Sequence, residues 1–120
     1  MSERGSAVVE FALVLPLVLF ALLAAVEVVV VARTHLEVGH AAREGAREAA
    51  TVPDVERAIT AVRRSLPESI ADSARVSVER QQHVGGTARV TVSVRHPVAA
   101  PLFGGFDVTL RSTAVMRVER

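Results

Sequence analysis

The first third of the chain contains an apolar stretch long enough to cross a lipid bilayer. Of the 22 residues from 11 to 32, 15 are Leu, Val or Phe, five are Ala, and the other two are Pro16 and Glu27. At about 1.5 Å per residue, a helix of this length covers roughly 33 Å, more than a hydrocarbon core of about 30 Å. Each Leu, Val or Phe favours insertion by about 0.3 to 0.6 kcal/mol, and one acid opposes it by on the order of 3 kcal/mol. The sequence therefore predicts one transmembrane helix over residues 6–32.

A cleaved secretory signal is the alternative interpretation of this stretch. The apolar region of such a signal has about 7–15 residues and ends at a site of the form Ala-x-Ala. The stretch here is longer, and its second half has no two alanines spaced two apart. Both features favour a helix that stays in the membrane.

The composition of the whole chain excludes several classes of protein. It has no Cys, so it has neither a disulfide framework nor a cysteine metal site, and its net charge of +1 gives no general attraction for nucleic acid. All 14 basic residues are Arg, which is typical of a GC-rich bacterial genome. The nearest approach to a metal cluster is Glu37, His40 and Glu44, which is more typical of a solvated helix face. We find no nucleophile motif or phosphate loop, and we predict no enzyme, no cofactor, no metal site and no nucleic-acid partner.

Residues 33–50 keep a helical period beyond the apolar stretch, with small residues along one edge. At 100° per residue, six residues share that edge: Val31, Val38, Ala42, Gly45, Ala49 and Val52. Gly39 and Gly45 each cost about 1 kcal/mol relative to Ala inside a helix, so they indicate that another segment approaches the backbone closely. We therefore expect Gly39, Ala42, Gly45 and Ala49 to be helix-packing residues. The segment that they contact is either the chain's own sheet or a neighbouring subunit.

The remaining residues predict a short helix followed by strands. A second helix is expected over residues 54–66, with four residues on its buried side: Val55, Ile59, Val62 and Leu66. After a loop over residues 68–73, alternating valines predict a hairpin of residues 75–81 and 87–95 that turns at Gly85 and Gly86. Residues 96–105 read as a loop, and residues 107–119 as a last strand. Helices followed by strands indicate an α+β fold with a three-stranded antiparallel sheet, in one domain of residues 33–120.

The junction before the apolar stretch resembles the cleavage site of type IV prepilins and their tight-adherence relatives. In those proteins a Gly precedes the cut and a Glu is the fifth residue of the mature chain; counted from Ser6, Glu10 is the fifth here. Three further segments resemble the TadE-like family of minor pilins or pseudopilins: Glu-Phe-Ala-Leu-Val-Leu-Pro at residues 10–16, Glu27, and Ala-Ala-Arg-Glu-Gly-Ala-Arg at residues 41–47.

This resemblance implies a pilin-like subunit of a tight-adherence (Flp-type, type IVb) pilus in a bacterial cytoplasmic membrane. A prepilin peptidase would remove a leader of residues 1–5 between Gly5 and Ser6, reading Glu10 and Phe11. The domain would lie outside the cytoplasm, and the partners would be other pilins or pseudopilins and the pilus assembly platform. The alternative is a single-pass membrane protein that keeps an unprocessed signal anchor and binds a ligand or partner with its outer domain.

Glu10, Glu27 and Pro16 are the unusual residues of the predicted membrane helix. Glu10 lies one turn from Ser6, so it can pair with a new amino terminus there or on an adjacent subunit; the alternative is a solvated flanking charge. Glu27 lies about 25 Å further along the axis, so the two acids cannot form one site. It is either an interfacial charge or a contact to another membrane subunit. Pro16 removes the hydrogen bond to the Ala12 carbonyl, and a bend there is either functional or tolerated.

The charges that flank the helix point to the opposite orientation. Arg4 precedes it, whereas Arg33, Arg43 and Arg47 follow it. The positive-inside rule loses force for segments longer than about 60 residues, and 88 residues follow the helix here. We therefore keep the orientation that the family resemblance implies.

Overall fold

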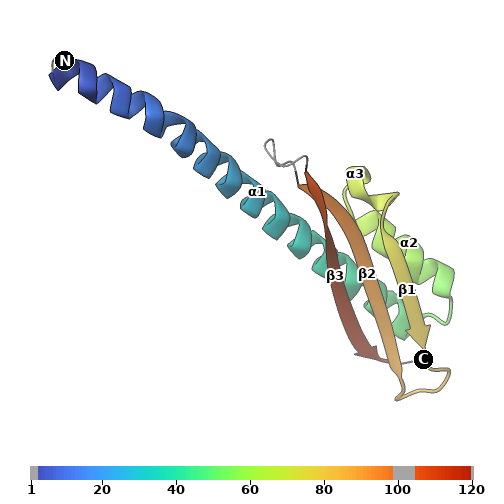
Figure 1. The fold of residues 1–120 in the computed structure, drawn as a ribbon. Coiled ribbons are helices and arrows are strands. Elements are labelled where there is room, and N and C mark those ends of the chain that lie inside the picture. Colours follow the sequence, from blue (N-terminus) through green and yellow to red (C-terminus); the bar gives the residue numbers. More distant parts are fainter. Residues whose placement is uncertain (1–2, 99–104, 120) are drawn as a thin grey trace. The chain divides into compact units, whose positions relative to one another are not determined.

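The computed structural model describes residues 3–98 and 105–119. The chain divides into two compact units, Met1–Val31 and Ala32–Arg120. Helix α1 (Glu3–Thr51) contributes residues to both units. The second unit adds helices α2 (Val55–Ser65) and α3 (Glu68–Ala71) and strands β1 (Arg75–Arg80), β2 (Thr87–Val98) and β3 (Phe106–Arg117), as Figure 1 shows.

The first unit is a single helical segment without a core. All its large apolar side chains from Val8 to Val30 are exposed, and α1 continues through Pro16 without interruption. None of the most apolar part of α1 is buried within the protein. A helix that is apolar on every side is not stable when it is exposed to water, so its surface needs a lipid or protein environment. By length and composition, α1 is long and apolar enough to cross a membrane.

The second unit is an α+β domain, as the sequence predicts. Its sheet has the order β1-β2-β3 with both pairs antiparallel, and the helices lie on one face of it (Figure 1). Even-numbered strand residues face the helices, and Val90, Val92 and Val94 of the central strand are almost completely buried. Odd-numbered residues form the opposite face, which no described element covers. We call this opposite face the outer face of the sheet.

Helix α2 begins and ends where local chemistry requires. The Asp54 side chain caps its first turn by accepting a hydrogen bond from the Glu56 amide at 3.0 Å. It ends before Pro67, because a residue that precedes proline disfavours the helical conformation. The prediction that Val55 lies on the buried side is wrong: Val55 is 43% exposed, and Ala58 is buried in its place. Val55 is the first residue of α2, so its side chain lies past the part of the domain against which α2 packs.

Two loop predictions are also wrong. Glu68–Ala71 forms a turn of helix, α3, inside the expected loop of residues 68–73. Strand β2 continues to Val98, whereas a loop was expected from residue 96; the rest of that loop up to residue 104 lies outside the described residues. Pro97 is tolerated in β2 because β1 pairs with β2 only as far as Ser93, so beyond that point β2 pairs on one side alone, with β3.

Candidate functional site

The junction expected to be a cleavage site lies in the first turns of α1. Helix α1 begins at Glu3, so the peptide bond between Gly5 and Ser6 has a helical conformation. Ser6 is exposed and Gly5 is half-buried. The first four amide groups of a helix lack intrahelical acceptors, and helix ends open at the lowest free-energy cost. A peptidase that needs an extended chain would therefore find its bond where α1 unwinds most easily.

Glu10 and Phe11 are both exposed, and Phe11 exposes 67% of its surface. Among the described residues, none forms an ion pair or a hydrogen bond with the Glu10 carboxylate. Glu10 follows Ser6 by four residues, so about 6 Å, slightly more than one helical turn, separates them along the axis. A carboxylate at this position is within reach of an amino group at Ser6, on its own chain or on an adjacent one.

Pro16 and Glu27 lie further along the same helical segment. Pro16 is exposed and Glu27 is half-buried. Their separation from Glu10 by six and 17 residues corresponds to about 9 Å and about 25 Å along the axis. The structure therefore brings neither of them together with Glu10.

The four expected packing residues lie in the second unit, and they differ in their surroundings. Ala42 and Ala49 are buried, Gly45 is buried, and Gly39 is half-buried. A Cβ atom on Gly45 would collide with Val62 Cγ2 of α2 and would lie 3.1 Å from Val90 Cγ1 of β2. On Gly39 the closest atom would be Ser112 Oγ at 3.6 Å, an ordinary contact. At Gly45, therefore, both α2 and the sheet approach the backbone of α1 closely.

The apolar edge of this part of α1 is wider than the sequence indicates. Its buried residues are Thr34, Val38, Ala41, Ala42, Gly45, Ala46, Ala49 and Ala50. Four of these residues lie outside the edge that the sequence predicts, because α1 contacts both α2 and the sheet: Thr34, Ala41, Ala46 and Ala50. Of the charged residues on the opposite side, Glu48 forms an ion pair with Arg57 of α2, with 3.1 Å between Oε1 and Nη2.

The described residues offer little to a metal or a small-molecule cofactor. No group of three His, Cys, Asp or Glu side chains within residues 3–98 and 105–119 could hold a metal ion. Glu37, on the helix face that it shares with His40 and Glu44, forms an ion pair with Arg33, with 3.5 Å between Oε1 and Nε. One hollow lies on the outer face of the sheet, and its lining side chains are polar or charged except for Val76.

Residues 5–47 match the family described as TadE-like protein. The match confirms the resemblance that the sequence suggested, and the TadE-like family is associated with the tight-adherence pilus. It covers the junction at Gly5, the exposed apolar helix and the small residues around Gly45. No curated protein and no solved structure matches the chain.

Proposed function

We propose that this TadE-like chain is a minor pilin or pseudopilin, a non-enzymatic subunit that a prepilin peptidase processes after Gly5. Residues 6–32 hold it in the bacterial cytoplasmic membrane, and the α+β domain lies outside the cytoplasm. Its partners are other pilins or pseudopilins and the assembly platform. The observation that carries the proposal is an exposed apolar helix that begins with Gly5 and Glu10 at prepilin spacing, within the TadE-like segment.

Glu10 has the central role in this proposal. A carboxylate in the hydrocarbon region costs on the order of 3 kcal/mol, and a new ammonium group at Ser6 carries a comparable cost. Pairing the two in a low dielectric offsets much of both costs. If an adjacent subunit supplies the amino group, the same free energy is gained when the two subunits come into contact. Pairing of Glu10 with that amino group would therefore favour assembly and fix the axial position of one helix against the other.

The test is the substitution Glu10→Ala in the native host, with Glu27→Ala as the matched control. Both variants remove one acid from the same helix, and both make it more apolar, so insertion should persist in each. We expect Glu10→Ala to impair piliation and surface adherence at matched expression. Glu27→Ala should have a smaller effect, because Glu27 lies about 25 Å from Glu10, towards the other end of the apolar segment.

Glu10→Gln separates charge from shape, since it keeps the length and hydrogen-bonding capacity of the side chain. If pairing with an ammonium is the mechanism, Glu10→Gln should behave like Glu10→Ala. Normal piliation with both variants would show that Glu10 has no role in assembly and is a flanking charge.

A further inference from the structure

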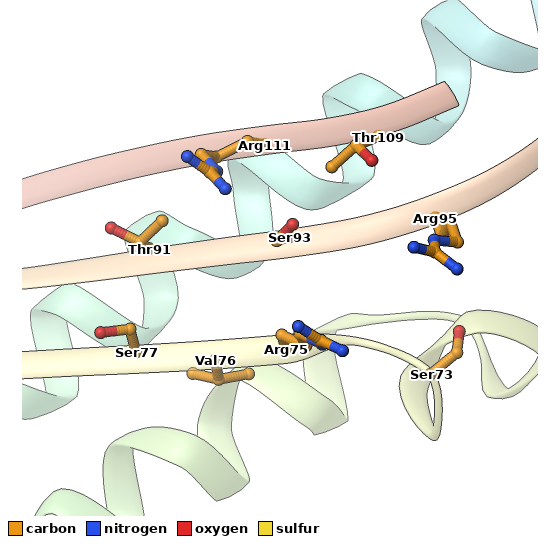
Figure 2. A pocket seen from close by; sticks show the side chains of 9 residues that line it. All are labelled: Ser73, Arg75, Val76, Ser77, Thr91, Ser93, Arg95, Thr109 and Arg111. Carbon is orange, nitrogen blue, oxygen red and sulfur yellow. The ribbon is translucent and has the colours of Figure 1, made fainter. Parts of the chain in front are cut away.

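The outer face of the sheet gathers three arginines from three different strands. Arg75 of β1 and Arg111 of β3 both lie opposite Ser93 of β2, and Arg95 follows two residues later on β2, opposite Thr109. Figure 2 shows the three side chains around Ser93, with Ser77, Thr91 and Thr109 nearby. We call these seven residues the basic face. At a strand spacing of about 4.8 Å, the backbones of Arg75 and Arg111 are about 10 Å apart.

The three guanidinium groups have no anionic partner in the part of the chain that the structure describes. Neither ion pair among the described residues includes Arg75, Arg95 or Arg111, and all three are exposed. Glu79 on the same face lies opposite Arg89, which compensates it. Asp107 lies opposite Pro97, diagonal to Arg95 and four residues from Arg111 along β3. One acid is therefore near three arginines.

The charge of the whole domain is unevenly distributed between its two sides. The described residues from 32 to 119 contain 12 Arg and ten Asp or Glu. The outer face holds five of these Arg (Arg75, Arg89, Arg95, Arg111, Arg117) and two of the acids (Glu79, Asp107). The other seven Arg and eight acids nearly balance each other. The positive excess of the described residues thus lies on one face, which is the electrostatic arrangement expected for contact with an anionic surface.

The side chains of the basic face also restrict the kind of anion. The seven residues are three arginines and four hydroxyl residues, so they can donate many hydrogen bonds to oxygen atoms. They include no aromatic ring on which a base or a sugar could stack, and no large apolar side chain to act as the centre of a protein interface. Guanidinium groups with hydroxyl groups between them fit separate phosphate groups best.

Within the second unit, the basic face lies near the end of β3 that is beside the beginning of this unit's part of α1. Within the second unit, Ser112 Oγ is 3.6 Å from the position of a Cβ atom on Gly39, and the Glu119 amide donates to the Ala50 carbonyl at 3.0 Å. Strand β3 therefore runs with its Arg111 and Thr109 end beside the beginning of this unit's part of α1. Gly39 is seven residues, or about 10 Å, from residue 32, where the apolar stretch ends.

We propose that the basic face binds the phosphate groups of anionic phospholipids at the surface of the membrane that holds α1. The inference shares the membrane anchor with the proposed function and is independent of pilus assembly. An anchor confines the domain to the bilayer surface, so weak contacts suffice. Each Arg near an anionic surface favours contact about fivefold, so the three together favour it on the order of 100-fold.

The test uses the full chain in lipid nanodiscs that contain no other pilus component. One set is made of phosphatidylcholine, and the other contains phosphatidylglycerol as well; both carry a gadolinium chelate on a lipid headgroup. Paramagnetic relaxation of the Ser93 and Thr109 amide protons should increase several-fold in the anionic discs relative to the neutral ones. The Ala61 amide of α2 should change little, and high salt should remove the difference.

Two triple variants that remove the same amount of charge distinguish lipid binding by the basic face from a general electrostatic attraction of the domain to anionic lipid. R75Q/R95Q/R111Q should abolish the difference between the two discs, whereas R43Q/R47Q/R64Q, with exposed arginines of α1 and α2, should keep it. Equal relaxation in both discs, or an equal loss in both triple variants, would overturn the proposal. Two further results would overturn the proposal if anionic lipid leaves the relaxation unchanged. Binding of millimolar glycerol phosphate to the basic face in neutral discs would indicate a site for free phosphate. Binding of an acidic peptide there would indicate a protein partner.

Discussion

The substitution Gly45→Ala should destabilise the α+β domain, although alanine is the better helix former. In an open helix the change would stabilise by about 1 kcal/mol. At Gly45 the new methyl group would collide with Val62 Cγ2 and would lie 3.1 Å from Val90 Cγ1. Both valines are 0% exposed, so neither can move towards solvent. Overpacking of this kind costs about 1–3 kcal/mol, and we expect a cost near 3, which leaves a net loss of about 2 kcal/mol.

Gly39→Ala is the matched control, six residues earlier in the same helix. Its methyl group would meet only ordinary contacts, the closest being Ser112 Oγ at 3.6 Å. It should therefore leave the domain unchanged or stabilise it by up to about 1 kcal/mol. The two variants should differ by about 2–3 kcal/mol in the free energy of opening, which corresponds to roughly 30- to 150-fold.

Amide hydrogen exchange of the full chain in detergent measures this difference directly. Exchange of the Val90 and Val92 amides of β2 should be faster in Gly45→Ala than in the wild type, and no faster in Gly39→Ala. Adding Val62→Ala to Gly45→Ala should recover part of the loss, because the two side chains compete for one space. If Gly45→Ala exchanges as slowly as the wild type, the close approach of α2 and the sheet to α1 is wrong.

Three further predictions concern processing, orientation and the end of α1. Protein from the native host should have a mass that begins at Ser6; a native terminus at Met1 or Ser2 would contradict processing after Gly5. Protease added to spheroplasts should digest residues 33–120, and protection that is lost only on permeabilisation would reverse the orientation. In denaturant titrations, Arg80→Gln should lower domain stability by about 1–2 kcal/mol, because Arg80 Nε donates to the Ala49 carbonyl at 2.7 Å near the end of α1. Arg117→Gln, at an exposed position, should stay within about 0.5 kcal/mol of the wild type.

Much of the fold could be predicted because the period of the apolar residues changes along the chain. Alternating valines in residues 88–94 specify a strand with one buried face, and Gly85, with φ of +89°, supports the turn before it. What escaped prediction depends on partners distant in the sequence. Whether Val55 or Ala58 is buried depends on which side of α2 meets α1, and His96 and Pro97 become strand residues because β3 pairs with them.

The candidate site was predictable to a smaller extent, for a physical reason. Spacing alone places Glu10 one turn from Ser6, so their proximity follows from helix geometry. The basic face carries no signal in the linear sequence: Arg75, Arg95 and Arg111 lie in three separate segments, and strand register alone brings them around Ser93. The sequence has an overall charge of +1, which conceals a positive excess confined to one face.

The two ends of the TadE-like segment, residues 5–47, have different surroundings in the structure. At its beginning, Glu10 and Phe11 are exposed on a helix that no part of the described chain covers, so substitutions there act on contacts with lipid or other proteins. Near its end, four small residues are buried under α2 and the sheet: Ala41, Ala42, Gly45 and Ala46. Arg43, which lies between them, and Arg47, which follows them, are exposed. Small residues at these positions allow close packing within the chain itself. A loss of piliation caused by a larger residue at Gly45 would therefore report on folding of the domain, and only the exposed end of the segment can report on assembly.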